Sequence, residues 1–87
     1  MNQLTQIKVF EQRDTGLHKS RELYGLLIAD LAAKIAQCPE DSVQYSVLVE
    51  QQMQYQTQQR HLYQLNTHQL EQRSQQLAEQ VKARYTA

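Results

Sequence analysis

Apolar residues recur every three or four positions along most of the chain, which is the spacing of one face of an α-helix. Only one proline and two glycines interrupt this pattern, and the strongest break is Cys38-Pro39-Glu40-Asp41-Ser42. Proline disfavours helix in the residue before it, and Asp41 or Ser42 can cap the next helix. The pattern predicts an all-α fold. We expect one domain, 1–87, built as an antiparallel hairpin of two long helices: arm one at about 3–38, a turn at 39–42 and arm two at about 43–85.

The first arm carries two stripes when it is projected as a helix. One stripe is large and apolar and is the expected seam against the second arm: Leu17, Tyr24, Leu27, Ile28, Leu31 and Ile35. The stripe beside it contains only small residues: Gly25, Ala29, Ala32 and Ala36. Together they cover more of the helix than one partner helix buries, so we expect the small residues to contact another protein. The alternative is that they are exposed alanines chosen as good helix formers.

Two local features leave the helix boundaries open. Asp14-Thr15-Gly16 either separates a short N-terminal helix or is a weak point within one long helix. The second arm has no glycine or proline between Ser42 and Tyr85, which predicts one helix of roughly 65 Å at 1.5 Å per residue. Its apolar stripe has the long spacing that packs one helix along another, with polar residues on or near the same face. The apolar members are Leu48, Tyr55, Leu62, Leu70, Leu77 and Val81, and the polar ones are Gln52, Gln59, Asn66 and Arg73.

Composition narrows the classes of function. Nine basic residues balance nine acidic ones, so the chain lacks the cationic excess that drives proteins onto nucleic acid or anionic lipid. Its apolar runs are too short to span a bilayer, and the polar start gives no sign of a signal peptide, so we expect the mature protein to be the whole chain. A single cysteine, Cys38, fits a reducing cytoplasm. The 17 glutamines favour helix here, because disordered glutamine-rich segments lack such periodicity.

The sequence offers no evident catalytic, cofactor or metal site. His61 and His68 are seven residues apart, whereas two metal ligands on one helix face need a spacing of three or four. The carboxylates are scattered without a facing pair for acid–base chemistry, and there is no glycine-rich phosphate loop. We therefore expect a protein that is not an enzyme and that needs no cofactor. A core of this size is marginal alone, so we expect a protein partner or a homo-oligomer.

Tyrosine suits interfaces that are partly apolar and partly wet. Tyr24 and Tyr55 lie on the expected seam and are assigned to the core. Tyr45 and Tyr63 project to one edge of that seam and are candidates for partner contact. The predicted partner-binding residues are Gly25, Ala29, Ala32, Ala36, Tyr45 and Tyr63.

Several landmarks resemble small helical proteins of bacterial type III secretion systems, which are virulence machines. The opening Met1-Asn2-Gln3-Leu4-Thr5, the break near Pro39, and Gln44-Tyr45 before a glutamine-rich helix are similar to the co-chaperones of needle subunits. This resemblance implies a helical hairpin that packs against a helical-repeat chaperone in the cytoplasm. The second arm runs on past the usual end of that family, from about Thr67.

A second resemblance is to the needle subunits themselves. Asp14-Thr15-Gly16, then Pro39-Glu40-Asp41, then Tyr55 match landmarks of that family, and it implies a self-assembling hairpin. The segment from Gly16 to Pro39 is long for a needle subunit, and the C-terminal segment 79–85 is polar where the family is apolar. We therefore expect a protein-binding module, a small co-chaperone or assembly factor that docks on a partner chaperone or cargo. The alternatives are a self-assembling structural subunit, as a filament or coiled-coil bundle, and a generic accessory protein of a phage or mobile element.

Overall fold

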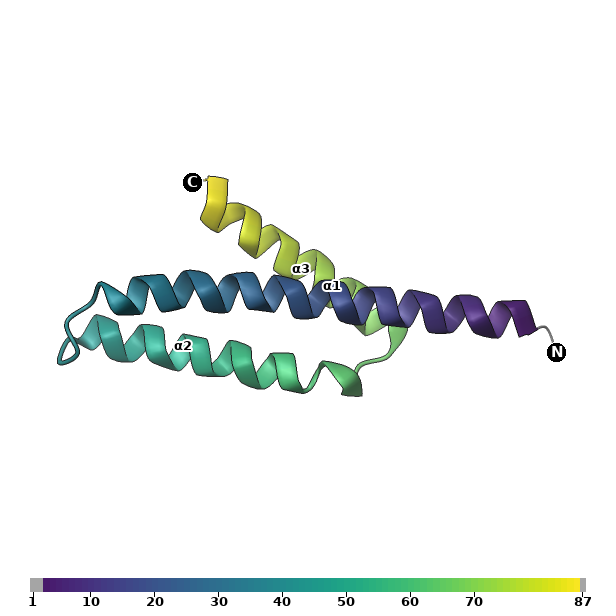
Figure 1. The fold of residues 1–87 in the computed structure, drawn as a ribbon, viewed down its shortest axis with the longest axis horizontal. Helices are drawn as coiled ribbons and strands as arrows, with labels where there is room; N and C mark the ends of the chain where they lie inside the picture. The colour runs from purple at the N-terminus through teal and green to yellow at the C-terminus, as the bar shows by residue number, and fades with distance from the viewer. Residues whose placement is uncertain (1–2, 87) are drawn as a thin grey trace.

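The chain folds as α-helices joined by short connections (Figure 1). A computed structural model describes the backbone of residues 3–86 and the side chains of residues 13–85. The elements are α1 (Gln3–Ala36), α2 (Val43–Arg60), the short 3₁₀ helix η1 (Leu62–Gln64) and α3 (Thr67–Thr86). No strand occurs within residues 3–86. The predicted all-α fold with a helical hairpin is confirmed.

The turn between α1 and α2 lies where the sequence places it. Ser42 is the N-cap of α2, with extended backbone angles (φ −83°, ψ 152°). Its hydroxyl accepts a hydrogen bond of 3.1 Å from the amide of Tyr45 and donates one of 2.7 Å to the carbonyl of Pro39. The cap satisfies an amide that α2 would otherwise leave unpaired, and the bond to Pro39 closes the turn. α1 and α2 therefore lie antiparallel, side by side (Figure 1).

Asp14-Thr15-Gly16 does not interrupt α1, so there is no separate N-terminal helix within the described residues. The reason for glycine is a close approach by α3. A Cβ atom on Gly16 would lie 3.2 Å from the Cβ atom of Leu70. The hydroxyl of Ser20, one turn further along α1, donates to the carbonyl of Leu70 at 3.5 Å. Small residues at these two positions thus let the first turn of α3 rest on α1.

The second arm differs from the single continuous helix that its lack of glycine and proline predicts. It breaks after Arg60, and α3 starts again at Thr67. Asn66 and Gln69 form a reciprocal capping box: the side chain of Asn66 accepts from the amide of Gln69 at 2.8 Å, and the side chain of Gln69 accepts from the amide of Asn66 at 3.0 Å. Burial of Leu62 in the core fixes the position of the connection. Capping and tertiary packing therefore outweigh helix propensity here.

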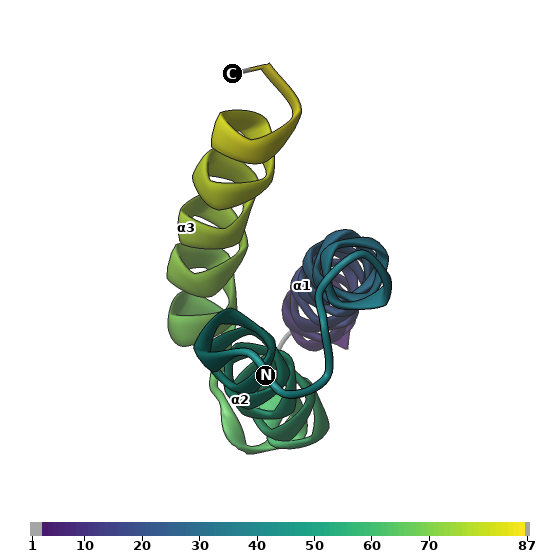
Figure 2. The same ribbon diagram turned by 90° about the vertical axis from the view of Figure 1, so that its left-hand side faces the viewer.

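The break reverses the chain, so α3 runs in the same general direction as α1 (Figure 1). α3 packs mainly on α1 and hardly touches α2. Figure 2 shows α3 rising steeply past α1 and away from α2. The result is an elongated molecule of 60 × 26 × 15 Å, in which the N-terminal part of α1 extends beyond the other helices (Figure 1).

The core is small and is built chiefly by α1 and α3. Fully buried apolar side chains come from α1, η1 and α3, and α2 contributes none. α2 is instead held by half-buried Tyr55 and by two glutamines whose side chains donate to α1 carbonyls: Gln52 to Ile28 at 3.2 Å and Gln59 to Arg21 at 3.0 Å. Among residues 13–85, the fully buried apolar residues are Tyr24, Leu27, Leu31, Leu62, Leu70 and Leu77.

Candidate protein-binding surface

The predicted stripe of small residues lies on the side of α1 that faces away from the core. Ala29, Ala32 and Ala36 are exposed, whereas Leu27 and Leu31 on the opposite side are buried. Gly25 is half-buried by its helix neighbours, yet a Cβ atom built there meets nothing within 4 Å. The four residues thus line an open surface that neither α2 nor α3 covers.

Two apolar residues that the sequence stripe left out widen this surface. Leu26 is 45 % exposed, and Ala33 is exposed two turns further on. Leu26 lies three residues before Ala29 and Ala33 lies four residues after it, and residues at these spacings are neighbours on a helix surface. This spacing could have assigned both residues to the surface from the sequence. We call the combined surface the outer face of α1; its members are Gly25, Leu26, Ala29, Ala32, Ala33 and Ala36.

Charged residues border the outer face toward the N-terminus of α1. His18 Nε2 lies 3.1 Å from Glu22 Oε1, and both side chains are mostly exposed. This spacing of four residues is that of an ordinary solvated pair on a helix surface. The outer face is therefore apolar over its three C-terminal turns and polar before them.

The two candidate tyrosines are not brought together. Tyr45 lies half-buried in the first turn of α2, whereas Tyr63 lies in η1, beyond the other end of that helix. Tyr63 is 62 % exposed, and its carbonyl accepts a 2.7 Å hydrogen bond from the guanidinium of Arg13. That bond ties η1 to α1 and leaves the ring free for contact. A single partner contact that includes both tyrosines would have to follow the whole length of α2.

A second exposed surface, on α2, was missed by the sequence argument. Val43 is 81 % exposed, and Val47 and Met53 are also exposed on this helix. A shallow, open hollow lies beside Met53, lined by Glu50, Gln54, Thr57 and Gln58. This surface is hard to predict from the sequence, because the few large apolar residues of α2 are interspersed with glutamine and form no clear apolar stripe.

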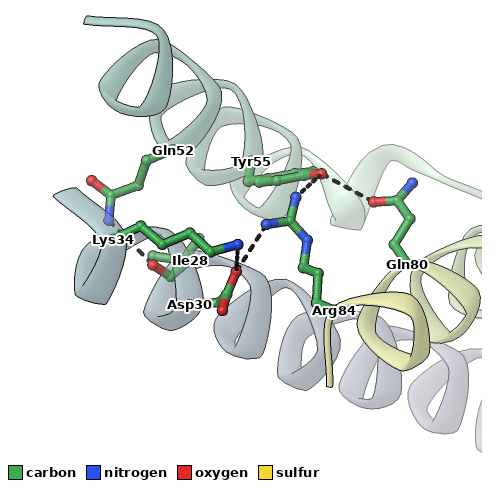
Figure 3. A network of polar contacts seen from close by, with 7 residues as sticks. All are labelled: Ile28, Asp30, Lys34, Gln52, Tyr55, Gln80 and Arg84. Atoms are coloured by element: carbon green, nitrogen blue, oxygen red, sulfur yellow. Dashed lines mark hydrogen bonds and ion pairs between the residues drawn. The ribbon is translucent and has the colours of Figure 1, made fainter. Parts of the chain in front are cut away.

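A polar network joins the C-terminal end of α3 to the hairpin (Figure 3). Arg84 donates to Asp30 on α1 at 2.9 Å and to the Tyr55 hydroxyl on α2 at 3.3 Å. The Tyr55 hydroxyl donates to Gln80 at 3.1 Å, and Lys34 lies 3.0 Å from the same carboxylate oxygen of Asp30. The hydrogen bond from Lys34 has the largest effect and lowers the pKa of Asp30 below its ordinary value. Burial opposes this shift, and the hydrogen bond from Arg84 lowers the pKa further. The network closes the bundle at the end opposite to η1.

A second group of polar contacts lies within the core. The Tyr24 hydroxyl donates to Gln58 at 2.9 Å and accepts from Arg73 at 2.6 Å, so one side chain of α1 links both other helices. The rings of Tyr24 and Tyr55 pack with centroids 6.1 Å apart. No buried polar side-chain atom among residues 13–85 lacks a hydrogen-bond partner. These contacts hold the fold together and expose no reactive group.

The chain matches no protein-family model, no curated protein and no solved structure. The resemblance to type III secretion proteins therefore stays a prediction from short sequence landmarks.

The described residues show no grouping for metal chemistry. No cluster of three histidine, cysteine, aspartate or glutamate residues that could hold a metal ion occurs in the part of the chain that the structure describes. Cys38 is a half-buried thiol in the turn that follows α1. None of the described helices combines the length and apolar character needed to cross a membrane. The outer face of α1 is the candidate site whose members are apolar and include no charged residue, whereas the exposed surface of α2 includes Glu50.

Proposed function

We propose that this chain is a non-enzymatic protein-binding module that packs the outer face of α1 against a helix of another protein. The observation that carries this proposal is a continuous, uncharged apolar surface that the chain's own helices leave open. Small side chains let two helices approach closely, so a partner helix can bury main chain as well as side chains. Leu26 at the border of the surface supplies a larger group for a partner pocket.

The extent of exposed surface supports a partner. The chain exposes 6480 Å². A compact monomer of its mass, 10.2 kDa, exposes about 5,300 Å² by the usual scaling of surface with mass. A standard protein interface buries about 800 Å² on each partner, which is comparable to the difference. Part of the difference comes from the elongated shape, in which the N-terminal part of α1 extends beyond the other helices, and the exposed surface is large enough for one partner interface.

The chemistry of the surface indicates the kind of partner. A surface without charge selects an apolar helix and excludes a strongly charged one, because burial of an unpaired charge is costly. A helical-repeat secretion chaperone, or its helical cargo, presents such helices, as the resemblance to co-chaperones implies. We place this activity in the cytoplasm, which a lone unpaired cysteine fits.

The proposal is tested by substituting one alanine of the outer face. Ala29→Glu places a charge in the contact and should weaken association by at least a hundredfold, because the cost of burying it is several kcal/mol at about 1.4 kcal/mol per tenfold. Ala83→Glu, at an exposed alanine of α3, is the matched control. Association is measured by sedimentation with a helical-repeat chaperone, if the gene neighbourhood encodes one, and with the chain alone.

The helicity of both variants is compared by circular dichroism, and it should stay at the wild-type value because both alanines are exposed. Loss of association in Ala29→Glu alone supports the proposal. Equal association for the wild type and Ala29→Glu in both experiments would contradict the proposal and would mean that the outer face is only an exposed helix surface.

A further inference from the structure

The connection between α2 and α3 contains nothing that forces a bend. Residues 61–66 include no glycine or proline, and no residue in the described chain has a positive φ. Leu65 departs from helical angles, with φ −86° and ψ 144°. Rotation of a few backbone angles would therefore join α2 and α3 into one helix, since every residue in the segment tolerates helical angles.

The apolar stripe also continues across the connection. Its members follow one another at seven or eight residues on both sides of the break: Leu48, Tyr55, Leu62, Leu70 and Leu77. This spacing keeps successive residues on one face of a continuous helix. The sequence thus supports the joined helix as well as the broken one, and tertiary contacts choose between them.

The contacts that hold α3 in place lie mainly on α1. Leu70 rests against Gly16 and Ser20, and Arg84 binds Asp30 at the other end. α2 and α3 meet chiefly through the Tyr55 hydroxyl. Joining α2 and α3 would carry α3 away from this binding surface of α1, because α2 runs antiparallel to α1 and the joined helix would continue toward the N-terminal end of α1.

We infer that two copies of this chain exchange α3 through the connection at 61–66, each α3 binding to the Gly16–Asp30 surface of the other copy's α1. The occupant is identified by the structure itself, because α3 is the segment already complementary to that surface. Exchange of an identical element reproduces the same contacts between chains and gives a closed dimer with two-fold symmetry. α3 runs in the same general direction as the α1 that it contacts, and a joined α3 would run antiparallel to the α1 of its own chain. The two α1 helices of the dimer would therefore run antiparallel, which a two-fold axis perpendicular to them allows.

The N-terminal part of α1 gives the exchanged dimer a further contact. It extends beyond the other helices in the single chain (Figure 1). In the exchanged dimer, the backbone of this part of each α1 lies beside the joined helix of its own chain, which continues past the end of α2 in that direction. The exchange gives up the capping box of Asn66 and Gln69, the hydrogen bond from Arg13 to the carbonyl of Tyr63 and the present position of Leu62 in the core. It gains the helical hydrogen bonds of the joined segment.

Two substitutions at the connection test this inference in opposite directions. Thr67→Pro fits the broken form, because Thr67 is the first residue of α3, where proline is favoured and its missing amide is not needed. The same proline would interrupt the joined helix. Asn66→Ala removes the side chain that caps α3 and is a better helix former within the joined helix. The wild type and both variants are refolded at low and at high protein concentration and analysed by sedimentation and circular dichroism.

The wild type should form a dimer after refolding at high concentration. Thr67→Pro should remain a monomer of unchanged helicity, and Asn66→Ala should raise the dimer fraction severalfold. A wild type that stays monomeric throughout would overturn the inference. A dimer that survives Thr67→Pro but is lost in Ala29→Glu would belong to the outer face of α1, and it would also overturn the exchange. If Thr67→Pro loses its helicity, the Asn66→Ala result decides, and an unchanged dimer fraction there counts against exchange.

Spin labels show whether α3 contacts belong to one chain or to two. Lys19 on α1 and Gln76 on α3 are exposed, and each is next in sequence to a residue that is buried, Ser20 and Leu77. The labels are introduced as cysteines with Cys38→Ser in the background. Dilution of the doubly labelled dimer with unlabelled chain before refolding should remove the short distance if α3 is exchanged. Persistence of the short distance in mixed dimers would mean that each α3 stays on its own α1.

Discussion

The two glycines of α1 allow a direct test of how α3 is seated. A Cβ atom at Gly16 would lie 3.2 Å from the Cβ of Leu70 and 3.9 Å from its carbonyl carbon, whereas one at Gly25 meets no atom within 4 Å. Alanine in place of glycine within a helix stabilises it by about 0.5–1 kcal/mol. Gly25→Ala should show that full gain, because nothing opposes it.

At Gly16 the same gain is opposed by contact with α3. Carbon atoms pack best at about 3.5–4.0 Å, so Gly16→Ala requires α3 to move by a few tenths of an ångström. We expect its unfolding free energy to stay within about 0.5 kcal/mol of the wild type, because the helix gain and the strain nearly cancel. Gly16→Leu cannot be accommodated without lifting the first turn of α3, which should cost about 1–3 kcal/mol. Gly25→Leu should be at least as stable as the wild type.

The four variants are compared by urea unfolding followed by circular dichroism, and by thermal unfolding. A change of about 1 kcal/mol shifts the Tm of a domain of this size by about 4–8 °C, so the expected order is readily resolved. The comparison of Gly16→Leu with Gly25→Leu is the most direct test, because both variants add the same side chain to the same helix and only position 16 faces α3. Equal midpoints for these two variants would show that α3 does not rest on Gly16.

Two further predictions concern the polar contacts. Asp30 has a lowered pKa in the folded chain, so its cationic partners stabilise the fold above its ordinary pKa of 3.8, and this contribution is lost as the pH falls through the lowered value. Urea midpoints should therefore fall on acidification, and Asp30→Asn should reduce that slope; an equal slope in the variant would contradict the contact. Tyr24→Phe should cost about 1–2 kcal/mol in thermal unfolding, because it removes a buried hydroxyl bonded to both other helices. Tyr63→Phe, at an exposed ring, is the control and should cost less than about 0.5 kcal/mol.

The hairpin could be predicted because its signals are local. Pro39 and Ser42 mark the turn by their own backbone and hydrogen-bonding preferences, and the apolar period of α1 gives its buried side. The outer face followed from the same projection, since residues opposite a seam are exposed unless a third element covers them. The sequence could not assign the partner of that face, because nothing within one helix encodes what approaches it.

The break in the second arm was missed for two reasons. One signal was readable: Asn66 and Gln69 have the spacing of a capping box, with asparagine and glutamine in place of the commoner serine and glutamate. The second signal could not be read locally, because the packing of α3 on α1 depends on Gly16 and Ser20, which contact a segment about fifty residues away. The sequence analysis treated Gly16 as a weak point or an end of a helix because glycine is a poor helix former. In the structure, its lack of a side chain allows α3 to approach α1 closely.

The glutamine contacts of α2 have a consequence for how freely this hairpin can change its sequence. Gln52 and Gln59 donate to main-chain carbonyls of α1, and a carbonyl has the same position whichever side chain its residue carries. The register of α2 against α1 is thus set by main-chain carbonyls, which lie two helical turns apart on α1, as the two glutamines do on α2. Arg21 is exposed and can accordingly be replaced without loss of register, whereas Ile28 also packs against the core. A substitution library should therefore be tolerated better at position 21 than at positions 52 and 59.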